Sequence, residues 1–254
     1  MIKELIEFMD DLSFLIYSNG HTMTFIQSGK PRFMNVECID SSISVLKMID
    51  IAIESSYIGN AYTLLRKYRD ELFLFLYLLE ASERDEPFSS DETKESKFVQ
   101  SWFNNAASDL HIGDITKYLN TNKKISRVIK KHDLFGEWKR IQNKLNDYVH
   151  SNGYKYVVYN TSKVRNRKIN EELSREIQQD VVFITILFIV ILILVRPNMI
   201  SSTDYIDSLD VGLEPTDGSQ YFVAPFVEDF VKNYIDDFDV DLRVFLKDNM
   251  YMDI

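Results

Sequence analysis

The chain has 254 residues, of which 45% are apolar and 27% are charged, ordinary proportions for a globular protein. Only 8 glycines and 5 prolines occur, which excludes collagen-like, linker-dominated and low-complexity chains and disfavours a turn-rich β-sandwich or barrel. A single cysteine, Cys38, excludes a disulfide framework and a cysteine-based zinc site, and 4 scattered histidines leave little for a histidine-built metal site.

The net charge of −10 is unevenly distributed along the chain. Residues 197–254 carry 13 acidic and 3 basic side chains, whereas residues 117–175 carry 15 basic and 5 acidic ones. A basic middle segment attracts phosphates, and an acidic end can cover that basic face or repel nucleic acid. The simpler interpretation is that both segments are solvated helix faces, because their charges alternate with apolar residues.

Apolar periodicity predicts an all-α fold without the alternation of strands and helices found in α/β proteins. The first helix ends at Ser18-Asn19-Gly20, and its acidic side chains and lack of an apolar h-region argue against a signal peptide. Residues 21–37 are expected to form a loop with room for a short extended piece, and the polar segment 82–97 an exposed loop. We expect eight to ten helices, which the pattern places at residues 2–18, 40–55, 60–81, 98–105, 114–119, 124–131, 134–150, 165–195, 225–234 and 241–250.

Residues 181–195 (VVFITILFIVILILV) form an apolar run of fifteen residues without a charge. As a helix this run spans about 22 Å at 1.5 Å per residue, whereas the hydrocarbon core of a bilayer needs about 30 Å. We therefore expect a buried central helix within a long helix near residues 165–195. Two alternatives stay open: a single membrane span with the basic flank 163–175 inside, and a buried strand, which the β-branched content permits.

The common nucleotide-binding and hydrolase signatures are absent, since the chain contains no GxxxxGK[ST], GxGxxG, GxSxG or HExxH. Asp204, Asp207 and Asp210 recur every three residues, a spacing with which a helix could hold a divalent cation. Such residues more often cap and solvate the start of a helix. We expect neither a metal nor a cofactor.

The segment 144–153 (KLNDYVHSNG) stands out as the candidate for catalytic chemistry. On a helix, Asn143, Asn146, Asp147 and His150 lie on one side. A histidine can transfer protons near neutral pH, and neighbouring amides and a lysine could hold a phosphate, which suits attack of an RNA 2′-hydroxyl on its own phosphate. The alternative is structural, because a histidine in the last turn stabilises the helix dipole.

Two segments resemble the HEPN superfamily: residues 60–79 (NAYTLLRKYRDELFLFLYLL) and residues 145–153 (LNDYVHSNG). This superfamily comprises all-α domains of prokaryotic toxin, abortive-infection and nucleic-acid-processing proteins. The resemblance implies a helical bundle, usually dimeric. In active members, an arginine with four to six residues between it and a following histidine cuts RNA without metal. His150 matches the histidine, but the arginine positions hold Asn143, Lys144 and Leu145. Lys144 keeps the positive charge without the bidentate fork of arginine, and Arg140 lies ten residues upstream of His150.

We therefore expect one domain overall, a HEPN-like bundle over residues 1–160 with the apolar helix and acidic segment of residues 161–254 packed on the same core. The expected function is RNA binding or metal-independent RNA cleavage by a cytoplasmic homodimer, in phage defence or a toxin–antitoxin system. The candidate catalytic residues are His150, Lys144 and Asn146, and the candidate RNA contacts are Asn143, Arg140 and Lys139. The alternatives are a non-catalytic interaction module that binds a protein partner, and a single-pass plasma-membrane protein with its N-terminus inside.

Overall fold

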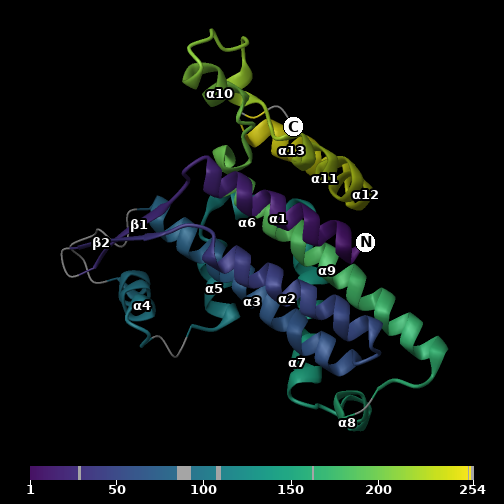
Figure 1. Ribbon diagram of the computed structural model, residues 1–254. Coiled ribbons are helices and arrows are strands. Elements are labelled where there is room, and N and C mark those ends of the chain that lie inside the picture. The colour runs from purple at the N-terminus through teal and green to yellow at the C-terminus, as the bar shows by residue number, and fades with distance from the viewer. Residues whose placement is uncertain (28–29, 85–92, 107–109, 162, 251, 253–254) are drawn as a thin grey trace.

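A computed structural model describes residues 1–27, 30–84, 93–106, 110–161, 163–250 and 252. Helices dominate it (Figure 1), which confirms the all-α prediction. The elements are α1 (Ile2–Ser18), β1 (Met23–Gln27), β2 (Lys30–Met34), α2 (Glu37–Glu54), α3 (Ile58–Glu83), α4 (Lys94–Phe103), α5 (Ile112–Leu119), α6 (Lys123–Lys131), α7 (Leu134–Val149), α8 (Tyr154–Thr161), α9 (Arg167–Val195), η2 (Pro197–Ile200), α10 (Asp204–Asp210), η3 (Ser219–Tyr221), α11 (Pro225–Phe230), η4 (Val231–Ile235, a π-helical turn), α12 (Asp236–Phe238) and α13 (Val240–Asn249).

The second half of α9 is the centre of the core. Almost every side chain from Val181 to Leu194 is buried, and helices α1, α3, α6 and α13 contact α9. By length and composition α9 is apolar enough to cross a membrane, yet 83% of its most apolar window is buried inside the protein. The expected long apolar helix is therefore present, and protein side chains already cover it.

Helix α3 is the second central element and is buried over most of its length. It packs along α2 and also contacts α5, α7, α8 and α9. The apolar side chains of α3 face the core, whereas Arg66 and Asp70 form an i,i+4 ion pair, 3.8 Å apart, on its outer side.

The acidic C-terminal segment forms a layer on α1 and α9 (Figure 1). Phe8 of α1 stacks on Phe230 of α11 with ring centroids 4.1 Å apart, and the Asn19 amide donates a 3.3 Å hydrogen bond to the Ser201 carbonyl. Leu242, Phe245 and Leu246 anchor α13 in the same hydrophobic core as the N-terminal helices. The two ends of the sequence thus share one core.

Several elements differ from the predicted ones. Strands β1 and β2 pair as an antiparallel hairpin within the segment expected to be a loop, and the tyrosine-rich stretch after residue 153 is helix α8. No residue of α8 or α10 is buried, which explains why neither helix has a readable apolar period. Half of the loop expected at residues 82–97 falls on residues 85–92, which lie outside the described residues, while α3 continues to Glu83 and α4 begins at Lys94.

The packing of α8 on α3 depends on Gly59. A Cβ atom at this position would lie 2.3 Å from Asn160 Oδ1 and 2.6 Å from the Tyr159 carbonyl oxygen. Replacing Gly59 with Ala should therefore push α8 away and lower the free energy of unfolding by about 1–3 kcal/mol, despite the better helix propensity of alanine.

Gly113 of α5 provides the matched control, because no atom lies within 4 Å of its added Cβ. Urea unfolding of Gly113→Ala should show a gain of up to about 1 kcal/mol. Equal effects of the two substitutions would contradict the close contact at Gly59.

Candidate functional site

Helix α7 carries all six residues singled out in the sequence, but the fold divides them between two faces. Lys139, Asn143, Asn146 and His150 follow one another along a single stripe that is exposed or half-exposed. Arg140 and Lys144 lie on the adjacent stripe, which faces α9. The six residues therefore do not form a single site.

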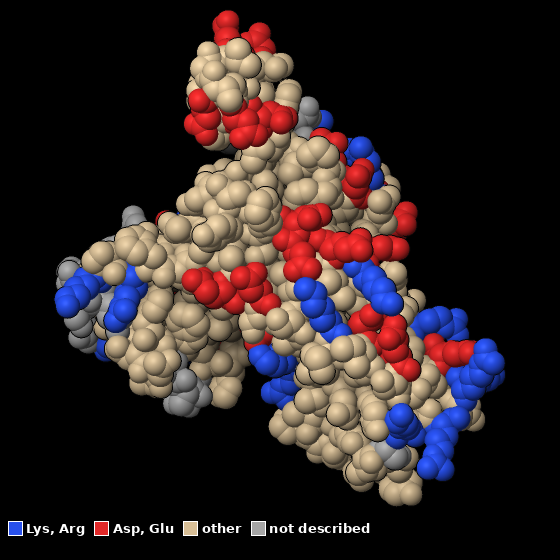
Figure 2. All heavy atoms as spheres, viewed as in Figure 1, with Lys and Arg blue, Asp and Glu red and all other residues tan. Residues whose placement is uncertain are grey.

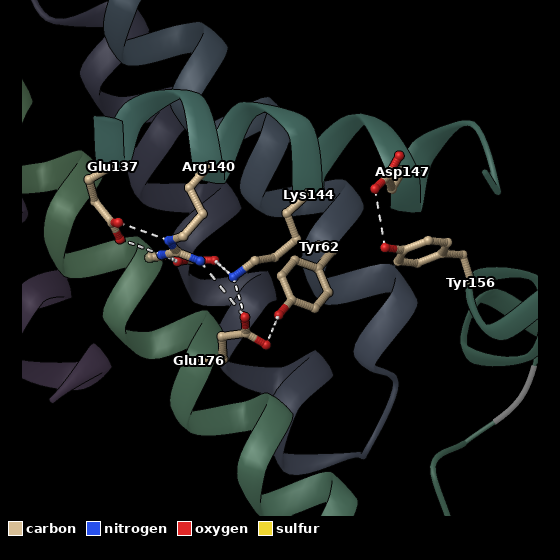
Figure 3. Close-up of polar contacts among 8 residues, drawn as sticks. Tyr62, Glu137, Arg140, Lys144, Asp147, Tyr156 and Glu176 are labelled. Atoms are coloured by element: carbon tan, nitrogen blue, oxygen red, sulfur yellow. Dashed lines mark hydrogen bonds and ion pairs between the residues drawn. The ribbon is translucent and has the colours of Figure 1, made fainter. Parts of the chain in front are cut away.

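Arg140 and Lys144 hold α7 on α9 through a network of ion pairs (Figure 3). The Asp180 side chain is fully buried and accepts hydrogen bonds from Arg140 at 2.6 Å and from Lys144 at 2.8 Å. Lys144 also pairs with Glu176 at 2.5 Å, and the Tyr62 hydroxyl donates to the other Glu176 oxygen at 3.1 Å. Both cations therefore pair with carboxylates of α9, and Arg140, whose side chain is partly exposed, also pairs with Glu137 of α7.

The protonation behaviour of this network follows from burial and pairing. Burial raises the pKa of Asp180, and the hydrogen bonds from Lys144 and Arg140 oppose that shift. Burial also acts to raise the pKa of Glu176, but hydrogen bonds from Lys144 and Tyr62 outweigh it and leave that pKa lowered. Burial of the Asp180 and Glu176 carboxylates therefore costs free energy, and the ion pairs with Arg140 and Lys144 offset that cost.

His150 has a different arginine neighbour from the one sought in the sequence. It is the residue that ends α7, its side chain is exposed, and its Nε2 lies 3.4 Å from Nη1 of Arg66 on α3. An arginine only donates hydrogen bonds, so in a hydrogen bond between these two side chains Nε2 is the acceptor. The fold thus places a guanidinium beside the candidate proton acceptor.

A groove of about 750 Å³ lies between α3, α4, α5 and α7, and Arg66 and Val149, the residue before His150, line it. Arg66, Lys67, Gln142 and Asn146 contribute polar side chains to it, whereas its opposite wall is apolar and aromatic, formed by Phe98, Trp102, Leu110 and Ile112. Asp70 and Glu71 also line it and pair with Arg66 and Lys67 respectively. The groove therefore combines paired charges, amides and ring faces next to His150.

Basic side chains gather at the end of the molecule where His150 lies. Figure 2 shows Lys and Arg side chains concentrated near α8 and the start of α9. The exposed cations of this basic end are Lys155, Lys163, Arg165, Arg167, Lys168 and Arg175. Two acidic residues, Glu171 and Glu172, lie among them, so the surface stays net positive and attracts polyanions.

Arg66 is the functional candidate that the spacing argument missed. Spacing rules examine residues within a turn or two, and Arg66 is 84 positions from His150. One feature of the sequence did point to Arg66: it lies in residues 60–79, the segment that resembles the HEPN superfamily. Asp204, Asp207 and Asp210 lie along α10, and no group of three potential ligands capable of holding a metal occurs in the part of the chain that the structure describes.

Comparison with known proteins gives no match: no protein-family model, curated protein or solved structure proves similar to this chain. The functional assignment therefore depends on the geometry of the described residues.

The ion-pair network makes a testable distinction between the two faces of α7. Lys144→Met keeps the aliphatic stem but leaves buried Asp180 with Arg140 alone, so the free energy of unfolding should fall by about 2–4 kcal/mol. Lys139→Met, on the exposed stripe of the same helix, should change it by less than about 0.5 kcal/mol. Urea unfolding measures both, and a neutral Lys144→Met would mean that Lys144 is free to bind a ligand.

Proposed function

We propose that this protein binds single-stranded RNA and cleaves it without a metal ion, using His150 and Arg66. The observation that carries the proposal is the 3.4 Å contact between the exposed imidazole of His150 and the guanidinium of Arg66. The HEPN resemblance called for an arginine beside this histidine, and Arg66 supplies from α3 the guanidinium that α7 does not place next to His150.

The chemistry assigns one role to each side chain. His150 Nε2 accepts the proton of a ribose 2′-hydroxyl as its oxygen attacks the adjacent phosphorus, and the bond from phosphorus to the 5′-oxygen breaks. Arg66 turns from His150 to the phosphate and stabilises the negative charge that develops on its oxygens. The protonated His150 then returns this proton to the 5′-oxygen of the leaving strand.

The surroundings of the pair favour a nucleic-acid strand as substrate. The basic end formed by α8 and the start of α9 attracts the phosphate backbone. Asn146 is half-exposed one turn before His150 and lines the groove, where its amide can contact a phosphate or a base. Asn143 and Lys139 continue the same stripe. Such a substrate is consistent with the cytoplasmic location and the defence or toxin–antitoxin role expected from the resemblance.

The decisive experiment incubates the full chain with end-labelled single-stranded RNA in EDTA. His150→Ala should reduce the cleavage rate by about 10²–10⁴-fold, the range for loss of a general acid or base, and Arg66→Ala by about 10²-fold or more. Arg66→Lys should retain intermediate activity because the charge remains.

His21→Gln is the control for the histidine substitution. His21 lies near the far end of α1, where its ring contacts the Asn198 carbonyl, and its loss should leave cleavage unchanged. Wild-type activity in folded His150→Ala would refute the catalytic assignment. If the wild type binds RNA but does not cleave it, the protein is an RNA-binding protein without nuclease activity.

The aromatic wall of the groove predicts where a base stacks. Trp102 is half-exposed, lines the groove and makes a T-shaped contact with Phe103 with ring centroids 5.1 Å apart, so it is the candidate to stack on a base. Trp102→Leu should weaken RNA binding by about 1–3 kcal/mol, the range for one stacked base, and raise KM more than it lowers kcat. Tyr221→Leu, an exposed aromatic in the C-terminal layer, should change neither constant.

A further inference from the structure

The segment from Asp204 to Asp217, here called the acidic arm, stands away from the body of the protein. In Figure 1 α10 projects at the top of the molecule, and none of its residues is buried. Four large apolar side chains of the arm are about half or more exposed: Ile206 at 52%, Leu209 at 49%, Val211 at 70% and Leu213 at 66%. Such a cluster on a projecting segment indicates a contact surface.

The arm also carries carboxylates without partners. Asp204, Asp207, Asp210, Glu214 and Asp217 are all exposed, and none forms an ion pair with any residue in the described part of the chain. Figure 2 shows this concentration of acidic side chains on the projecting end. A partner of the arm therefore needs cations around an apolar surface.

Helix α6 presents that complementary surface. Its exposed side chains are Lys123, Lys124, Arg127, Lys130 and Lys131, and none of these cations pairs with a carboxylate among the described residues. Beside them Phe135 is 56% exposed at a groove of about 510 Å³. Ile129 and Lys130 also line this groove, together with the polar residues Asn120, Ser126 and Asp133. The same phenylalanine covers an apolar pocket that reaches Trp138 and Leu187. Among the described residues, a row of cations without ion pairs on α6 thus lies beside an exposed aromatic side chain, with Asp133 as the one carboxylate in the groove.

We propose that the acidic arm of one chain docks on the α6–Phe135 surface of a second copy. Within one chain no ion pair joins the two surfaces. A phosphate backbone would match the cations but would leave the arm's apolar side chains and Phe135 uncovered. The arm supplies carboxylates and apolar side chains together, and one chain carries both halves, so two reciprocal contacts close a two-fold dimer.

This contact is independent of the proposed RNA chemistry. Helix α7 separates α6 from His150 by about 24 Å along its axis, so the docking surface and the catalytic pair lie at opposite ends of α7. Loss of the dimer contact and loss of cleavage can therefore be measured separately.

Sedimentation velocity of the full chain tests the contact. The wild type should dimerise, more weakly in high salt because salt screens exposed charge pairs. Reversing the arm charges (Asp207→Lys with Asp210→Lys) or the α6 charges (Arg127→Glu with Lys130→Glu) should each raise the dimer Kd at least about 10-fold. Unfolding midpoints should not change, because all four positions are exposed.

Mixing the two charge-reversed proteins gives the sharpest result. In a reciprocal dimer the mixed pair has both contacts matched, the reversed arm on the reversed α6 and the native arm on the native α6. An equimolar mixture should therefore restore dimers that neither variant forms alone. Leu209→Ser with Val211→Ser should also weaken the dimer, whereas reversal of the exposed Lys117 on α5 should not.

Three outcomes would overturn the proposal. The first is a wild-type chain that stays monomeric at low salt and high concentration. The second is a dimer that survives both charge reversals, and the third is a failure of the mixture to restore it. If the wild type is monomeric and the α6 reversal instead weakens binding of labelled RNA, α6 is a nucleic-acid surface.

Discussion

The apolar half of α9 must be covered on all sides, and the other helices are arranged to do this. Each large apolar side chain removed from water contributes about 1.5–3 kcal/mol, and this run has almost no polar interruption. Helices from both ends of the sequence, α1 and α13 among them, pack on it. The acidic C-terminal segment is therefore fixed to the core by Leu242, Phe245 and Leu246, while its carboxylates stay in water.

Asp180 marks the boundary at which this apolar run begins, and it determines how α7 is rotated. A fully buried carboxylate needs cations, and Arg140 and Lys144 provide them. Turning those two residues toward α9 leaves the neighbouring stripe, with Asn146 and His150, facing solvent and α3. The contact between His150 and Arg66 follows from that rotation, so a structural ion-pair network sets the orientation of the candidate catalytic histidine.

The separation of charge along the sequence becomes a separation in space. Cations near α8 and the start of α9 lie beside His150, whereas those of α6 lie at the other end of α7. The carboxylates of the arm are held apart from both within one chain. This arrangement gives two basic surfaces that can act independently, one suited to a polyanion and one to the arm of a second molecule.

The sequence alone determined the helices with one buried face, because a repeat of apolar residues every three to four positions is a local property. It also singled out His150, because its neighbours lie within two turns of one helix. It missed α8 and α10, which bury nothing and so carry no apolar period. Only the tertiary structure determined that Lys144 and Arg140 form ion pairs with Asp180, and that Arg66 contacts His150. The spacing of residues within a helix determines which of them share a face. Which other element that face contacts depends on packing between segments far apart in the chain.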